Sequence, residues 1–219
     1  MTDWHELSPI LLLSFQQTIY MVAWTMVIAG VLGLCIGVLL YTTRRGGLLQ
    51  NTAVFQLLNV LVNIVRPIPF IIFITAVGPL TLVVMGTTIG TRSVVFPMAA
   101  MASFVIGRIV EQNLVGVDPG VIEAARAMGA SKPRIIWSVL IPEALGPLVL
   151  GYTFVFVAVI DMSAMAGYVG GGGLGNFAIT YGYQQFNWPV TLVTVVIIIV
   201  IVQAAQLLGN WLARRVMHR

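Results

Sequence analysis

Residues 189–212 read PVTLVTVVIIIVIVQAAQLLGNWL, an apolar run without a single charged side chain. A helix needs roughly 20 apolar residues to cross the ~30 Å hydrocarbon core of a bilayer, because each residue adds about 1.5 Å. The run shows no alternation of polar and apolar positions, which favours a helix over a strand of a membrane barrel. This stretch therefore predicts a membrane-spanning helix, closed by Arg214 and Arg215.

Earlier parts of the chain repeat this pattern. The charged residues amount to 8% of the 219 residues, whereas a soluble domain carries about 25%. We therefore predict an all-α integral membrane protein of five spans, forming one transmembrane domain over residues 1–219. The second span is interrupted by Arg66-Pro67-Ile68-Pro69, and the third contains Pro97. The four spans that precede residues 189–212 are expected at about 18–41, 52–75, 88–106 and 142–160.

The distribution of Lys and Arg predicts the orientation of the chain, because cytoplasmic loops of membrane proteins are enriched in them. An odd number of spans places nine of the 11 basic residues on one side, which we assign to the cytoplasm. They are Arg44, Arg45, Arg108, Arg126, Lys132, Arg134, Arg214, Arg215 and Arg219. Asp3, Glu6 and Arg92 lie on the other side. We therefore expect the N-terminus outside and the C-terminus in the cytoplasm. We expect no nucleic-acid partner, because the basic residues lie at the ends of the apolar runs, where they set the orientation in the membrane.

The longest polar connection extends over about 108–135, between the third and fourth spans. Its centre, residues 117–133, reads VDPGVIEAARAMGASKP. Asp118 suits an N-cap and Pro119 the first helical position. Gly129 suits the position just after a helix end. The stretch predicts a short helix, a glycine turn and a second helix that leads into the fourth span.

Two interpretations of this ordered loop stay open from the residues alone. Small Ala124 and Ala125 allow close backbone approach, and Glu123 and Arg126 can form ion pairs with a partner protein. The same residues also suit an amphipathic hairpin that lies on the membrane surface.

The loop also carries a family resemblance. It is similar to the EAA signature, Glu-Ala-Ala-x-x-x-Gly-x9-Ile-x-Leu-Pro, of binding-protein-dependent ABC importer permeases. The residues that carry this similarity are Glu123, Ala124, Ala125, Gly129, Val139, Ile141 and Pro142. Val139 and Ile141 depart from the signature conservatively. In that family the loop is the coupling helix, which sits in a groove of the ATPase subunit. The resemblance thus implies coupling roles for Glu123, Ala124, Ala125, Arg126, Gly129 and Pro142.

Further segments resemble the permeases of methionine-uptake ABC transporters. They are residues 66–70, 86–90, 108–111, 123–129, 163–165, 172–175 and 181–183. The resemblance implies a type I ABC importer permease fold in the bacterial inner membrane and a homodimer. It also implies two ATP-binding cassette subunits, which hold ATP and Mg, and an extracytoplasmic substrate-binding protein. One departure is Met162, preceded by Asp161, where the family usually has an aromatic residue before Ser-Ala-Met.

The candidates for the substrate pathway are Asp161, Met162, Ser163, Met165 and Arg66. The resemblance implies that the segment of Met162 to Met165 lines the central passage. A carboxylate at Asp161 can bind an ammonium group or cap the following turn. Thioethers suit a passing apolar side chain, although core packing explains any single methionine equally well.

Arg66 lies between long apolar runs and beside two prolines. An ionisable residue inside a membrane is a functional candidate. The alternatives are a snorkelling arginine or a structural partner for Glu143 or Glu111.

No catalytic, cofactor or metal site is expected in this chain. Its single lysine, Lys132, follows Ser131 and not the glycine of a P-loop. His5 and His218 are expected on opposite sides of the membrane, so they cannot share a metal. We expect a permease that imports methionine (D or L) or a related small amino acid, driven by a separate ATPase. The alternatives are another small amino acid or a short peptide, and an ion-coupled secondary transporter using Asp161.

Overall fold

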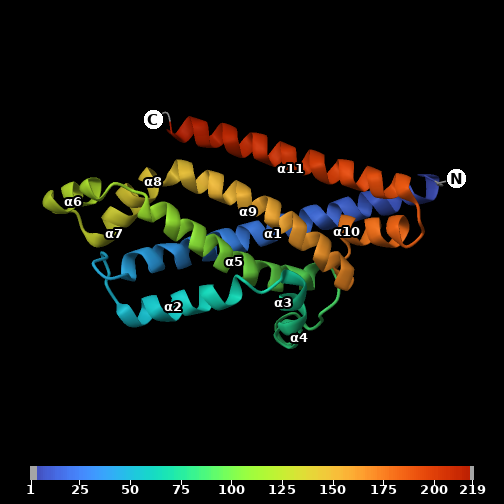
Figure 1. The fold of residues 1–219 in the computed structure, drawn as a ribbon, viewed down its shortest axis with the longest axis horizontal. Helices are drawn as coiled ribbons and strands as arrows, with labels where there is room; N and C mark the ends of the chain where they lie inside the picture. Colours follow the sequence, from blue (N-terminus) through green and yellow to red (C-terminus); the bar gives the residue numbers. More distant parts are fainter. Residues whose placement is uncertain (1–3, 218–219) are drawn as a thin grey trace. The chain divides into compact units, whose positions relative to one another are not determined.

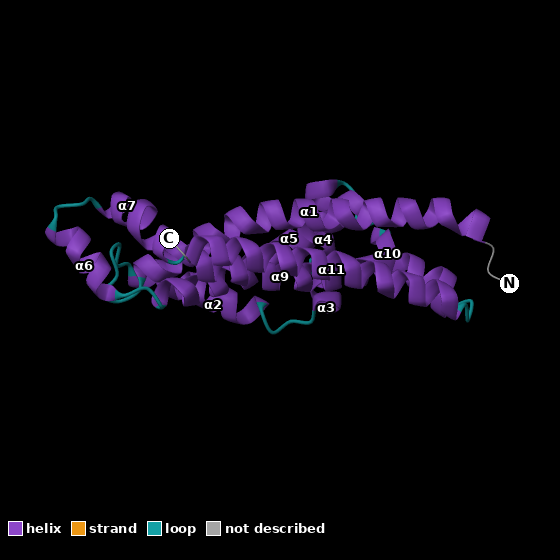
Figure 2. Cartoon of the chain, turned by 90° about the horizontal axis from the view of Figure 1, so that it is seen from above, coloured by secondary structure: helices purple, strands orange, loops and turns teal. Residues whose placement is uncertain are grey.

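The computed structural model describes residues 4–217, and this range contains helices and loops but no strand (Figures 1 and 2). Asp3, His218 and Arg219 lie outside the described residues. The helices are α1 (Trp4–Thr43), α2 (Thr52–Val65), α3 (Phe70–Ala76), α4 (Gly78–Met85), α5 (Thr91–Val115), α6 (Pro119–Ala127), α7 (Lys132–Ile135), η1 (Ile136–Leu140), α8 (Ile141–Glu143), α9 (Leu145–Ala166), η2 (Gly167–Gly171), α10 (Gly173–Phe177), η3 (Ala178–Tyr183) and α11 (Trp188–Met217); the three η elements are π-helical.

Four of these helices are long and apolar enough to cross a membrane, or up to five spans if the pair α2 and α3 counts as one. The four are α1, α5, the helix Leu145–Gly171 and α11. The expected span 18–41 lies inside the 40-residue α1, which begins at Trp4. The expected span 88–106 starts later, at Thr91, because Gly90 has a φ of +104°.

The second apolar run is divided at its prolines. α2 ends at Val65 and α3 begins at Phe70. Pro67 and Pro69 lack the backbone N–H that would continue the hydrogen-bond ladder, so the helix stops there. A further short helix, α4, follows α3 directly and ends at Gly86, whose φ is +75°. The sequence pattern did not predict α4 as a separate element.

The chain divides into two compact units. The first comprises Met1–Ala29, Ile68–Ala102 and Phe156–Gln206. The second comprises Gly30–Pro67, Ser103–Val155 and Leu207–Arg219. Four of the five boundaries fall inside α1, α5, α9 and α11, so each of these helices contributes residues to both units, and the fifth lies between α2 and α3.

In the second unit, α1 and α5 touch through glycines. A Cβ at Gly33 would lie 2.5 Å from Cβ of Ile106, and one at Gly37 would lie 2.5 Å from Cγ1 of Val110. Ile36 of α1 packs in turn against Gly107 of α5. A Cβ at Gly107 would lie 2.6 Å from Cγ2 of Ile36. Small residues spaced four apart allow this close backbone approach between membrane helices.

Close contacts at glycine also join α9 to its neighbouring helices in this unit. A Cβ at Gly151 would lie 2.5 Å from Cγ2 of Ile109 on α5. Gly209 of α11 leaves room for the side chain of Thr153. The hydroxyl of Tyr152 donates a hydrogen bond to the carbonyl of Gly30, at 2.7 Å. Close contact at glycine therefore recurs at each of these three helix pairs.

We expect Gly37→Ala to destabilise the chain by about 1–3 kcal/mol, because the added methyl overpacks a filled contact. The measurement is the free energy of unfolding of the purified chain in detergent micelles. Gly78→Ala is the matched control, since a Cβ there meets no atom within 4 Å. Adding Val110→Ala should not restore stability, because a Cβ at Gly37 would still lie 2.6 Å from the carbonyl oxygen of Gly107. Equal unfolding free energies for Gly37→Ala and the control would contradict the proposed contact.

Candidate functional site

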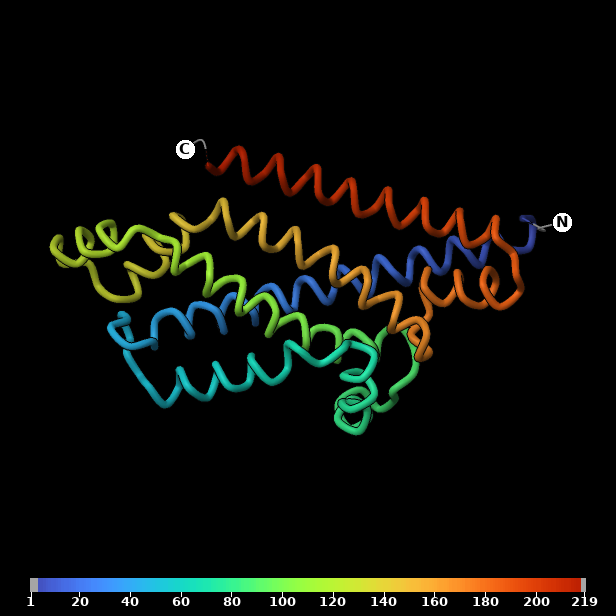
Figure 3. Tube along the Cα trace, viewed as in Figure 1, coloured from blue at the N-terminus to red at the C-terminus, as the bar shows by residue number. Residues whose placement is uncertain are grey.

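The polar loop of the second unit forms the helical hairpin that its sequence predicts, with α6 and α7 as its arms (Figure 3). The Asp118 carboxylate accepts a hydrogen bond from the backbone N–H of Gly120, at 2.8 Å. Pro119 opens α6, and Gly129 follows its end with a φ of +78°. The N–H of Ala130 then donates to the carbonyl of Ala125 at 3.1 Å, a bond typical of glycine-terminated helices.

Burial separates the two faces of α6. Ile122 and Ala125 are buried against the rest of the unit. Of the expected coupling residues in the hairpin, Glu123, Ala124, Arg126 and Gly129 are exposed, whereas Ala125 is buried. Met128, at the tip of the hairpin, is 81% exposed. Sequence reasoning missed Met128, although an apolar residue beside the glycine turn of a polar loop is a signal for a contact surface.

A π-helical segment joins the hairpin to α9. In η1 the N–H of Ile141 donates to the carbonyl of Ile136, five residues earlier. Pro142 follows at once in α8 and has no N–H to donate, so the ladder must shift at this point. Pro142 is itself exposed. The hairpin is therefore linked to α9 through a continuous helical connection with a local distortion, a type of element that is frequent at functional sites.

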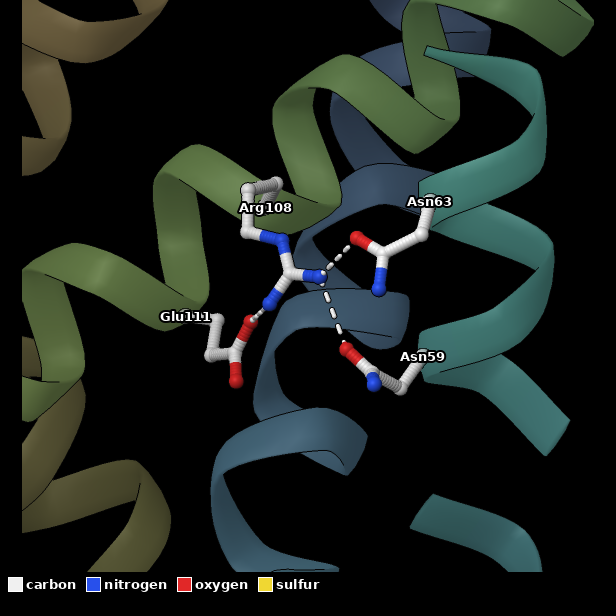
Figure 4. Close-up of polar contacts among 4 residues, drawn as sticks. All are labelled: Asn59, Asn63, Arg108 and Glu111. Carbon is white, nitrogen blue, oxygen red and sulfur yellow. Dashed lines mark hydrogen bonds and ion pairs between the residues drawn. The ribbon is translucent and has the colours of Figure 1, made fainter. Parts of the chain in front are cut away.

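A polar cluster holds α5 to α2 in the same unit (Figure 4). The guanidinium of Arg108 donates to Glu111 at 2.6 Å, to Asn59 at 2.7 Å and to Asn63 at 2.6 Å. The side chains of Arg108 and Glu111 are only 16% and 11% exposed. Both charges are paired and hydrogen-bonded, as buried charges require. They lie in the part of α5 that extends to Val115, beyond the expected end of its span.

Arg66 does not use either carboxylate that the sequence suggested as a partner. Glu111 pairs with Arg108, and that is the one ion pair within residues 4–217. The Arg66 backbone N–H donates to the carbonyl of Val62 at 3.1 Å and closes α2, while its side chain is exposed.

The other pathway candidates lie on α9 in the first unit, where burial separates them. Asp161 and Met165 are exposed, and their spacing of four residues puts them on one helix face. Met162 and Ser163 are buried, and the Ser163 hydroxyl donates to the carbonyl of Ile160 at 2.7 Å. The exposed Tyr168 continues the face of Asp161 and Met165 toward the glycine-rich segment.

The glycine-rich segment that follows α9 is docked on α1 within the first unit. The N–H of Gly173 donates to the side-chain oxygen of Gln17 at 2.7 Å, and that of Leu174 donates to the Thr18 hydroxyl at 2.8 Å. Gly173 has a φ of +84°, and a Cβ there would lie 2.8 Å from the Thr18 hydroxyl. This position therefore requires glycine for both conformation and space.

Residues 33–218 match the family described as the binding-protein-dependent transport system inner membrane component. The chain belongs to this family. It is thus an inner-membrane transport subunit, and the resemblance predicted from residues 123–142 is confirmed. The match begins inside α1 and includes the hairpin, α9 and α11.

Individual relatives agree with this assignment. The chain is 42% identical to the "Probable D-methionine transport system permease protein MetI" of Vibrio cholerae, covering 99% of this chain and 97% of the relative. It is 44% identical to the "Methionine import system permease protein MetP" of Bacillus subtilis, covering 78% of each chain. A solved structure of the MetNI methionine ABC transporter in an inward-facing conformation superposes with a TM-score of 0.94, at 36% identity and 99% coverage of both chains. The expected all-α, type I ABC permease fold is therefore confirmed.

We expect Arg108→Met to lower the free energy of unfolding by about 2–3 kcal/mol, because Glu111 is left buried without its charge partner. The double variant Arg108→Met with Glu111→Leu should recover most of the loss, since it removes both charges. Thermal or denaturant unfolding in micelles checks both values. A double variant that is less stable than the single one would show that the cluster does not act through its charge pair.

Proposed function

We propose that this chain is the permease subunit of an ATP-driven methionine importer. The hairpin carries the proposal, since it presents Glu123 and Arg126 on an exposed face and continues into α9 through η1 and α8. The names of relatives that cover 99% and 78% of the chain support methionine as the substrate. Two copies form the translocation pathway, and two ATPase subunits hold ATP and Mg and hydrolyse the nucleotide.

The hairpin transmits motion from the ATPase to the spans. Closure of the ATPase pair on ATP moves α6, which it grips through Glu123, Arg126 and the tip at Met128. The helical connection through Pro142 passes this motion into α9, where Asp161 and Met165 lie. The chain is oriented with its N-terminus outside and with the hairpin and C-terminus in the cytoplasm, as the distribution of basic residues supports.

The substrate enters from an extracytoplasmic binding protein and passes the exposed face of α9. The Asp161 carboxylate offers an acceptor for the ammonium group of an amino acid. The flexible thioether of Met165 offers an adaptable apolar contact for the substrate side chain. Met162 and Ser163 support this face from inside, because both are buried beneath it.

We expect Glu123→Arg to reduce ATP-dependent uptake of labelled L-methionine by at least about tenfold, because a reversed charge faces the ATPase groove. The assay uses proteoliposomes that contain this chain with its ATPase and binding protein, with ATP inside. Glu6→Arg is the control, since it makes the same reversal at an exposed position remote in sequence from the hairpin. Excess unlabelled methionine should abolish the signal.

Three outcomes would contradict parts of the proposal. ATP hydrolysis without methionine uptake would leave the assignment as a permease intact but would exclude methionine as the substrate. The substrate would then be another small amino acid or a short peptide. Unchanged uptake in Glu123→Arg would remove the coupling role of the hairpin. Uptake that needs no ATP and is lost in Asp161→Asn would indicate an ion-coupled secondary transporter.

A further inference from the structure

The second unit contains a cavity of about 830 Å³ between the start of α9 and the end of α11. Most of its lining is apolar, and includes Leu145, Gly146, Leu212 and Val216. Ligand pockets in proteins typically measure about 300–1,000 Å³. The cavity is thus large enough for a bulky amphipathic molecule, and none of the proposed transport steps uses it.

Two opposite charges line this apolar cavity. Glu143 comes from α8 and Arg215 from the last turn of α11. They do not form an ion pair with each other, since the one ion pair within residues 4–217 joins Arg108 and Glu111. The Glu143 carboxylate therefore has no cationic partner in the part of the chain that the structure describes.

Arg215 is held in place by an aromatic neighbour. Its guanidinium carbon lies 4.4 Å from the centroid of the Trp211 ring. A stacked guanidinium keeps its N–H groups at the edge of the plane, where they can donate to a phosphate. Tryptophan is also enriched at membrane–water interfaces. These two residues therefore place the charged part of the cavity at headgroup level.

A ligand for this cavity needs an apolar body and a head that carries both a cation and an anion. A phospholipid with a phosphate and a primary ammonium meets each requirement. Its phosphate accepts hydrogen bonds from Arg215, its ammonium donates to Glu143, and its acyl chains cover Leu145, Leu212 and Val216. A purely anionic lipid would bring its charge close to Glu143 without compensation.

We propose that this cavity binds one aminophospholipid from the membrane leaflet in which these helix ends lie. Basic sites between membrane helices are known to select lipid headgroups, and here the added carboxylate shifts the preference from anionic to zwitterionic lipid. Pro142 also lines the cavity. The bound lipid therefore contacts the joint between the hairpin and α9.

Native mass spectrometry of the purified complex of this chain with its ATPase tests the site. The complex is titrated with dioleoyl phosphatidylethanolamine and, separately, with dioleoyl phosphatidylglycerol. We expect one tightly bound phosphatidylethanolamine per permease chain. Glu143→Gln should weaken it by about threefold to fivefold, because an exposed charge pair contributes modestly. The same variant should strengthen phosphatidylglycerol binding, because the carboxylate no longer repels the anionic headgroup. Arg215→Gln should weaken both lipids.

Two further variants locate the binding. Arg214→Gln removes a neighbouring charge that does not line the cavity, and it should change neither lipid. Leu212→Trp fills the cavity without changing charge, and it should weaken both lipids. Size-exclusion chromatography of each complex confirms that the variants fold and assemble.

Each remaining outcome overturns the proposal in a defined way. Unchanged phosphatidylethanolamine binding in Glu143→Gln, or equal losses in Arg214→Gln and Arg215→Gln, would show non-specific lipid association. Preferred binding of phosphatidylglycerol would identify an anionic-lipid site. Unchanged binding in Leu212→Trp would show that the lipid binds outside this cavity. The cavity would then be filled by another segment of the chain or by the ATPase.

Discussion

Close approach between α1 and α5 at Gly33, Gly37 and Gly107 is the contact on which the rest of the second unit depends. Lipid tails are as apolar as leucine side chains, so burial of apolar surface does little to hold membrane helices together. Van der Waals contact must supply that attraction, and it decays steeply with distance. A side chain at any of these glycines would separate α1 from α5. The same contact brings α9 close enough for Tyr152 to bond the Gly30 carbonyl.

Charge inside this protein is rare and is compensated where it is buried. The Arg108 guanidinium donates hydrogen bonds to Glu111 and to the side-chain oxygens of two asparagines of α2. These bonds allow α5 to carry a charged pair within a long helix, because both charged groups are hydrogen-bonded. The exposed charges are of a different kind. Glu123 and Arg126 face outward on α6, where a protein partner can reach them, and Glu143 and Arg215 line an open cavity.

The residues of the family signature lie in the hairpin and in the helix that follows it. The sequence signature that marks binding-protein-dependent permeases falls on α6, its glycine turn and the proline of α8. The structure adds the reason for the spacing. The glycine terminates α6, the intervening residues form α7 and the π-helical η1, and the proline sits where the hydrogen-bond ladder shifts. The hairpin is thus joined to α9 by helical backbone, which is the connection that the proposed transmission of motion requires.

Local pattern alone determined the membrane-spanning runs, the break at Pro67 and Pro69, the hairpin with its caps and the family. Each of these depends on neighbouring residues along the chain, through helix length, missing N–H groups and left-handed glycine conformations. Tertiary structure alone decided that Met162 and Ser163 are buried while Asp161 and Met165 are exposed. It also decided that Arg108 meets Asn59 and Asn63, and that Glu143 and Arg215 share a cavity. These pairings join residues far apart in sequence, and they follow from which helices approach closely, which no periodicity within a single helix specifies.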